Sequence, residues 1–131
     1  MNILKSVDIE NEVRLALADY FEVYCRPLPE TYGLPNLLIT AVGGSNDNTI
    51  DTFTVRIDSR ATTDELAYET LVNALGVLNE QANNQFGALR AIVQNSLASW
   101  GSDPVRPDLK LCTATVLVVA HQKSAQINPI N

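Results

Sequence analysis

The chain has 131 residues, a formal net charge of −6 at pH 7, and 46% hydrophobic against 18% charged residues. This length fits one domain that buries a core without disulfides or metal. The nine Lys and Arg residues form no cluster, which argues against nucleic-acid binding through charge, and no apolar run approaches the roughly 20 residues that span a bilayer. The low charged fraction favours a protein that hides part of its surface in an assembly.

The N-terminus indicates a protein that is cytoplasmic at synthesis, and the cysteines add little to this. Acidic residues occur within the first ten positions, where a signal peptide would have its apolar core. Cys25 and Cys112 lie far apart and fit no metal-binding spacing. They are typical of buried or half-buried free thiols, with a disulfide or a reactive thiol as the alternatives.

The first predicted element is an amphipathic helix over residues 6–24. Its apolar residues repeat at helical spacing from Ile9 onward, and Ser6 stands where an N-cap is needed. Pro27 and Pro29 end the helix, because the residue before a proline is pushed out of helical geometry.

A proline-rich loop and a hairpin follow. Residues 27–35 hold three prolines and a glycine, which predicts a loop. Residues 37–42 form a short apolar run typical of a buried strand, and residues 50–59 alternate between apolar and polar as in a half-buried strand. The Gly- and Asn-rich stretch 43–49 joins the two into an antiparallel hairpin.

The second predicted helix begins at Thr62-Thr63-Asp64-Glu65. This stretch fits a capping box, with Thr62 as N-cap and Glu65 reaching back to it. An apolar stripe runs from there to Ala82. Gly76 interrupts the stripe at a cost of about 1 kcal/mol relative to Ala, and a close packing partner would explain it.

The last quarter of the chain predicts strands and a tail. Residues 89–100 fit a strand or a helix, and we favour a strand. Residues 101–108 predict a loop, and residues 109–121, dense in Val and Thr, predict the clearest strand. The polar residues 122–131 predict a frayed tail.

The resulting order is helix, strand, strand, helix, strand, strand. It predicts an α+β fold with two helices packed on one face of a four-stranded, mainly antiparallel sheet. The chain shows no internal repeat and no linker. We therefore expect residues 1–131 to form a single domain, with a core over about 6–121 and a polar tail over 122–131.

The motifs that carry chemistry are missing from the sequence. His121 is the only histidine, and no nucleophile elbow is present. The loop 43–48 lacks both the Lys-Ser/Thr ending of a phosphate loop and the spacing of an EF-hand. The sequence predicts no enzyme activity, no cofactor and no metal.

The charged residues of one predicted strand are the first candidates for an interface. Arg56, Asp58 and Arg60 alternate along one side of a predicted strand, which is either a solvated face or a subunit interface. In the second case the arginines would meet acids of a neighbouring copy, with Asp58, Glu65 and Glu69 as candidates.

Three further side chains complete the predicted interface. Tyr32 and Leu34 would be the apolar anchors of the proline-rich loop. Trp100, the single tryptophan, stands beside a loop, where it is either a core residue or an interface anchor.

The order of the predicted elements over residues 6–121 is distinctive. The apolar strand Leu37-Leu-Ile-Thr-Ala-Val is followed by Thr52-Phe-Thr-Val-Arg-Ile-Asp-Ser-Arg-Ala and then by the helix start Thr62-Thr-Asp-Glu-Leu-Ala-Tyr-Glu-Thr-Leu. This order is similar to that of the tail-terminator and tail-completion proteins of long-tailed bacteriophages, and of their minor-capsid and head–tail joining relatives.

The resemblance implies a non-enzymatic ring, commonly a hexamer. Such a ring ends the tail tube and contacts the tail-tube protein and the head–tail connector proteins, with DNA as passing cargo and no membrane. It would form in the host cytoplasm and stay in the virion, and an acidic subunit suits it because like charge does not trap DNA. The alternatives are a small-molecule-binding or catalytic α+β domain, and an unrelated adaptor protein.

Overall fold

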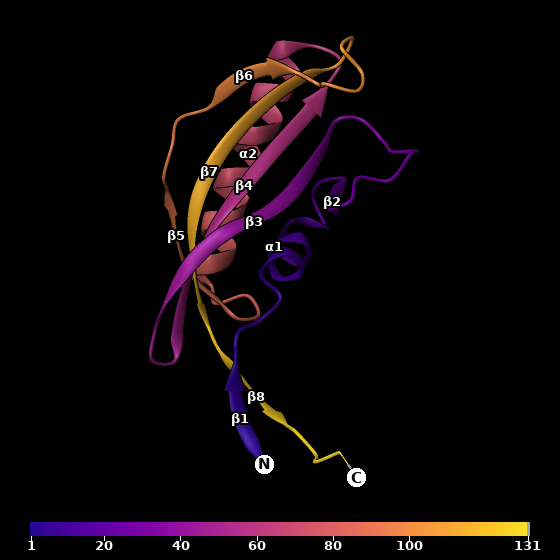
Figure 1. The fold of residues 1–131 in the computed structure, drawn as a ribbon. Coiled ribbons are helices and arrows are strands. Elements are labelled where there is room, and N and C mark those ends of the chain that lie inside the picture. The colour runs from indigo at the N-terminus through magenta and orange to yellow at the C-terminus, as the bar shows by residue number, and fades with distance from the viewer. Residues whose placement is uncertain (131) are drawn as a thin grey trace.

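The protein is described by a computed structural model that covers residues 1–130 (Figure 1). The described residues form two helices and eight strands, which build one six-stranded sheet and one two-stranded sheet. In chain order the elements are β1 (Asn2–Lys5), α1 (Ile9–Leu17), β2 (Val23–Cys25), β3 (Asn36–Asp47), β4 (Ile50–Ala61), α2 (Asp64–Asn83), β5 (Leu89–Gln94), β6 (Ser99–Ser102), β7 (Lys110–His121) and β8 (Lys123–Gln126).

The main sheet is larger than the sequence predicts, so the expectation of a four-stranded sheet is wrong. Its order is β2-β3-β4-β7-β5, with β6 also paired to β7. The long antiparallel strands β3, β4 and β7 form its centre, as the predicted hairpin and the Val-rich segment require. The short β2 pairs in parallel with β3, which makes the sheet mixed.

The edge strand beside β7 is divided in two. β5 pairs with residues 116–120 of β7, and β6 pairs with residues 110–113. The prediction of a strand within residues 89–100 is therefore confirmed for 89–94, while residues 95–98 leave the sheet before β6 returns to it.

Helix α1 is shorter than predicted. Its N-cap is Asp8, whose carboxylate accepts a hydrogen bond from the Asn11 amide at 3.3 Å, so Ser6 is not the cap. The helix ends at Leu17, whose carbonyl accepts bonds from the amides of Tyr20 and Phe21. The chain then enters β2, because the apolar residues after this turn line up with β3 instead of continuing the helical stripe.

Helix α2 follows the prediction closely, with its cap moved by one position. Thr63, not Thr62, is the N-cap, and its hydroxyl accepts a bond from the Leu66 amide at 3.2 Å. Asp64 and Glu65 stand in the first turn, where acidic side chains complement the helix dipole.

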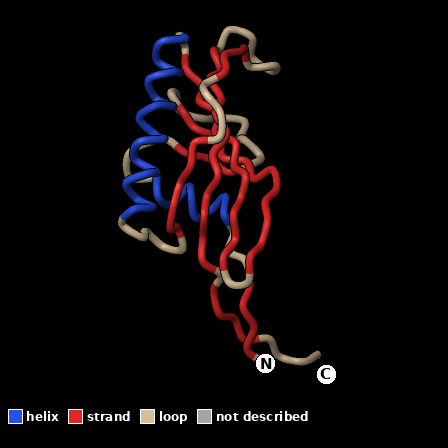
Figure 2. The backbone as a smooth tube through the Cα atoms, turned by 90° about the vertical axis from the view of Figure 1, so that its left-hand side faces the viewer, coloured by secondary structure: helices blue, strands red, loops and turns tan. Residues whose placement is uncertain are grey.

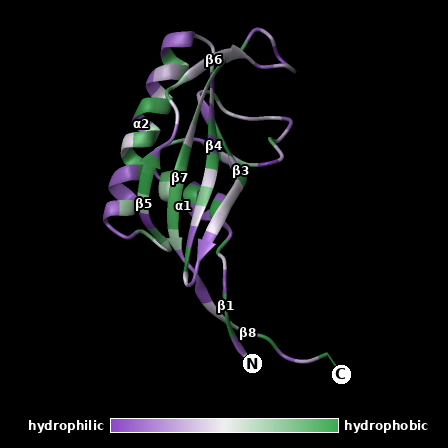
Figure 3. Ribbon diagram, turned by 60° about the vertical axis from the view of Figure 1, so that its left-hand side comes forward, coloured by the Kyte–Doolittle hydropathy of each residue, from purple (hydrophilic) through white to green (hydrophobic). Residues whose placement is uncertain are grey.

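Both helices pack on the same side of the sheet (Figure 2). Val13 and Leu17 of α1, Leu71 and Leu78 of α2, and Ile57 of β4 belong to one fully buried cluster. Alternate residues of β3, β4 and β7 point into this core, and β7 is the most hydrophobic of these three strands in Figure 3. No helix of the described residues lies over the opposite side of the sheet.

The two ends of the chain form a projecting arm, defined here as β1 with β8. Asn2 pairs with Gln126 and Lys5 with Lys123, so the strands run antiparallel. The arm extends away from the body, with the Asn2–Gln126 pair at its outer end (Figures 1 and 2). Residues 123–126 are thus a strand and not the frayed tail that their polar composition predicts, because the backbone of β1 supplies their hydrogen-bonding partners.

Candidate interaction surfaces

The first candidate surface is the uncovered side of the main sheet, called here the open sheet face. Residues that pair directly across antiparallel strands point to the same side, so the register gives four rows. The rows are Leu38, Asp58 and Thr113; Thr40, Arg56 and Thr115; Thr54, Leu117 and Val93; and Thr52, Val119 and Ala91.

The open sheet face is nearly neutral. Its two charged residues pair with each other, since Arg56 Nε lies 3.4 Å from the Asp58 carboxylate. Asp58 is buried and also accepts a bond from the Thr113 hydroxyl at 2.7 Å, while the Arg56 side chain is half exposed. The rest of the face consists of threonines and aliphatic side chains, of which Thr40 is buried, Val93 is exposed and the others are of intermediate exposure. This composition suits contact with another protein surface.

Arg60, predicted to reach a neighbouring copy, is used inside the subunit. Its Nε lies 2.6 Å from the Asp103 carboxylate, and both side chains are buried. The other Asp103 oxygen accepts bonds from the amides of Val105 and Arg106. Burial raises the pKa of Asp103, but the bonds from Arg60 and the two amides outweigh it, and the net pKa is lowered. Arg60 therefore fastens the loop before β7 to β4.

The proline-rich loop lies beside that same loop. Arg106 has a raised pKa, caused first by its hydrogen bond to Asp108, with a smaller contribution from Tyr32. Tyr32 is half-buried and Leu34 is exposed. Of the two predicted anchors, Leu34 is thus the more accessible in the free subunit.

The second candidate surface is an apolar groove between α2 and the divided edge β5–β6. Its volume is about 630 Å³. Trp100 of β6 and Tyr68 of α2 stack across its rim with ring centroids 5.3 Å apart and planes at 20°. Trp100 stays 51% exposed, so of the two predicted roles the core role does not apply. The lining includes Tyr68, Val72, Gly76, Ile92, Leu97 and Trp100.

Two predicted acids border this groove. Glu65 and Glu69 are exposed on α2, within one helical turn of Tyr68 and Val72. Sequence reasoning missed Tyr68, Val72 and Leu97, which supply most of the apolar rim. Their signal was present, because all three are large apolar residues outside the predicted core stripe.

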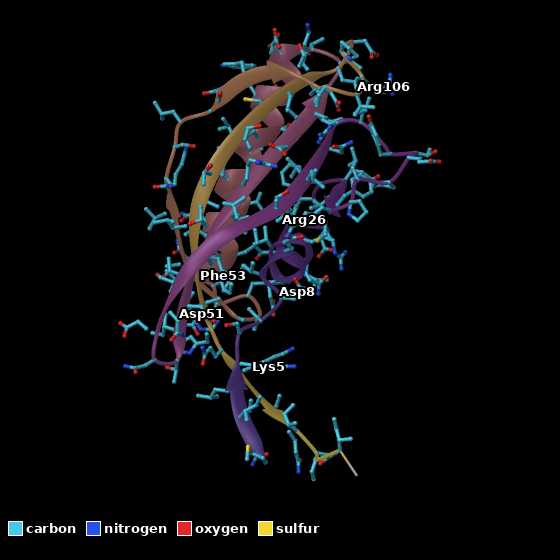
Figure 4. All side chains as sticks on the ribbon, in the orientation of Figure 1. Lys5, Asp8, Arg26, Asp51, Phe53 and Arg106 are labelled. Atoms are coloured by element: carbon cyan, nitrogen blue, oxygen red, sulfur yellow. The ribbon has the colours of Figure 1, made fainter. Side chains whose placement is uncertain are left out.

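The root of the arm is a third polar cluster that the sequence did not reveal. The buried Asp51 carboxylate accepts bonds from Ser6 at 2.5 Å, Asn46 at 2.6 Å and Gln122 at 3.3 Å. These bonds, first those from Ser6 and Asn46, lower the pKa of Asp51. Because Ser6 follows β1 and Gln122 precedes β8, one carboxylate anchors both strands of the arm (Figure 4).

Residues 1–130 contain no group of three His, Cys, Asp or Glu side chains placed to hold a metal ion. His121 is exposed at the end of β7. Cys25 and Cys112 are free, and burial raises the pKa of both thiols, which keeps them protonated. No helix in the described part of the chain is long and apolar enough to cross a membrane.

Comparison with known proteins adds no family. The chain matches no protein-family model, and a search of curated proteins finds no match.

Proposed function

We propose that the protein is a non-catalytic structural subunit that assembles with copies of itself into a ring at the end of a phage tail tube. The observation that carries this proposal is the open sheet face. The ring position follows from the sequence resemblance described above, and a hexamer is the size that the resemblance implies.

A sheet face left to water usually carries charged side chains on alternate residues. Here the alternate residues of β4 and β7 are threonines and aliphatics, with the exposed Arg56 already paired to Asp58. Covering such a face releases water from apolar surface, worth roughly 25 cal/mol per Å², and leaves little charge to desolvate. The face is therefore suited to burial against another protein surface.

The charge distribution supports the same role. All fifteen acidic residues lie between Asp8 and Asp108, so the body of the subunit is strongly acidic. A ring of such bodies would repel DNA phosphates, which suits a channel that DNA passes without binding.

Two valines give a matched test of the open sheet face. Val93 is 55% exposed on this face, and Val105 is 86% exposed on the loop before β7. We expect Val93→Glu to abolish self-association in light scattering, because it places an unpaired charge in the interface. Val105→Glu should assemble as the wild type does. The free energy of unfolding of both variants should lie within about 0.5 kcal/mol of the wild-type value.

The biological role needs a second measurement. Added to polymerising tail-tube protein from the same phage or prophage, the wild type should stop tube growth and Val93→Glu should not. Tubes that reach the same length with and without the wild-type protein would contradict the tail role, whatever its oligomeric state. A Val93→Glu protein that assembles normally would contradict the use of the open sheet face.

A further inference from the structure

The apolar groove has an unexplained gap in its wall at Gly76. A side chain added at this position would meet no atom within 4 Å, and the glycine has ordinary helical geometry. Gly76 therefore weakens α2 without any gain in packing inside the described subunit. A missing side chain on a helix lets another backbone approach closely, so the gap is explained by a chain segment that enters the groove.

The side chains of the arm are mostly left unburied by the described subunit. Of its eight residues only Ile3 and Ala125 are partly covered, and Leu4 is 52% exposed. A two-stranded ribbon alone is marginally stable in water. The arm thus gains stability if it docks on a further surface.

The charges of the arm indicate what that surface carries. Lys5 and Lys123 are direct cross-strand partners, and like charges in this position destabilise a ribbon. The segments 1–6 and 122–130 contain no acid, whereas the body carries all fifteen. An acidic rim placed over the two lysines would turn their repulsion into attraction.

We propose that the arm of one copy docks in the groove of a second copy, with Lys5 and Lys123 facing Glu65 and Glu69. The inference rests on the self-association proposed above and names its contacts. The groove combines apolar lining, the Gly76 gap and two acids at its border, which match the exposed aliphatic side chains, the backbone and the lysines of the arm. The arm points away from its own body, so the groove of another copy is its target (Figures 1 and 4).

This contact joins two different surfaces. A joint between two copies uses the arm of one and the groove of the other. The first copy keeps a free groove and the second a free arm, so copies add head to tail until a ring closes. The open sheet face and the arm are then separate parts of the assembly, and they can be tested separately.

A charge-swap experiment tests the pairing. The arm variant has Lys5→Glu with Lys123→Glu, which keeps a like-charged pair in the ribbon but reverses its sign. The groove variant has Glu65→Lys with Glu69→Lys. Each variant alone sets like charges against each other, and we expect its assembly to weaken at least roughly tenfold in light scattering.

An equimolar mixture of the two variants should restore assembly. Every arm then finds a groove of opposite charge, so an alternating ring forms if the number of subunits is even. Trp100, the single tryptophan, stands on the groove rim, and its emission should shift to the blue in the mixture but not in either variant alone.

Gly76 supplies the control for the groove itself. Gly76→Leu should block docking and keep the Trp100 emission of the free subunit. Gly76→Ala should raise the melting temperature of the subunit, which shows that the position tolerates a side chain there. Circular dichroism of each variant confirms that it is folded.

The outcomes separate this inference from the proposed function. Wild-type assembly that both charge variants and Gly76→Leu leave unchanged overturns arm docking alone. Loss of assembly in the variants without restoration in the mixture also overturns it, because the paired charges then do not meet. A wild type that is monomeric at all concentrations overturns both proposals, and restored assembly without any effect on tail tubes overturns only the tail role.

Discussion

The two ends of β4 hold neighbouring segments in different ways. Near its C-terminal end, Arg60 binds Asp103 with both side chains buried, and the loop before β7 is fixed by a pair of full charges. At its N-terminal end, Asp51 holds the arm through two neutral donors, Ser6 and Gln122, and a third neutral donor, Asn46, comes from β3. A buried ion pair loses most of its value when one partner is removed, whereas neutral donors near the surface can turn to water. We therefore expect the C-terminal end of β4 to be a rigid attachment and the N-terminal end to be an attachment that can be adjusted during assembly.

The largest effect is expected at the rigid end. Asp103→Asn keeps an oxygen for the amides of Val105 and Arg106 but removes the charge that faces Arg60. Arg60 Nη1 is already buried without a partner, so the guanidinium would be left uncompensated. We expect urea unfolding to show that the free energy of unfolding falls by about 3–5 kcal/mol.

A double variant sharpens this prediction. Arg60→Met combined with Asp103→Asn removes the uncompensated charge and should recover most of the lost stability. If Asp103→Asn alone stays within about 0.5 kcal/mol of the wild type, the pair is not a rigid anchor and the contrast between the two ends disappears.

A smaller and local effect is expected at the arm. Asp51→Ala removes the shared acceptor of Ser6, Asn46 and Gln122, and we expect the arm to lose about 1–3 kcal/mol of protection. Hydrogen exchange should show faster exchange of the β1 and β8 amides with little change in β4 and β7. Asp47→Ala, at an exposed acid of the same hairpin, is the matched control and should leave the arm unchanged. Uniform loss of protection across the main sheet would show that Asp51 supports the body and not the arm.

The central fold could be predicted because its patterns are local. Phe53, Val55 and Ile57 alternate within one strand, and the Val-rich segment of β7 repeats the same period, so the hairpin and the last long strand follow from the sequence. The second helix has both its apolar stripe and a Thr cap within a few residues of the predicted start.

The parts that could not be predicted depend on partners distant in the chain. Residues 18–24 continue a helical apolar spacing, yet residues 23–25 form a strand because they pair with β3. β8 has no apolar alternation, and it is a strand only because β1, at the other end of the chain, pairs with its backbone. The Arg60–Asp103 pair and the Tyr68–Trp100 stack likewise join residues separated by more than 30 positions. In both cases the residue types alone do not predict which distant residue will be the partner.

Acid should release the arm in a way that depends on Asp51. Its pKa is lowered in the folded protein by the bonds from Ser6 and Asn46, so the ionised carboxylate stabilises the attachment at any pH above the ordinary value of 3.8. This contribution is lost as pH falls below 3.8 and through the lower folded pKa, because the protonated group accepts these bonds poorly. Hydrogen exchange of β1 and β8 should therefore show an opening free energy that declines in this acid window. In Asp51→Ala the same measurement should be flat, since Ser6, Asn46 and Gln122 do not titrate. A decline of equal size in that variant would assign the acid response to another carboxylate and leave the arm with no titrating anchor.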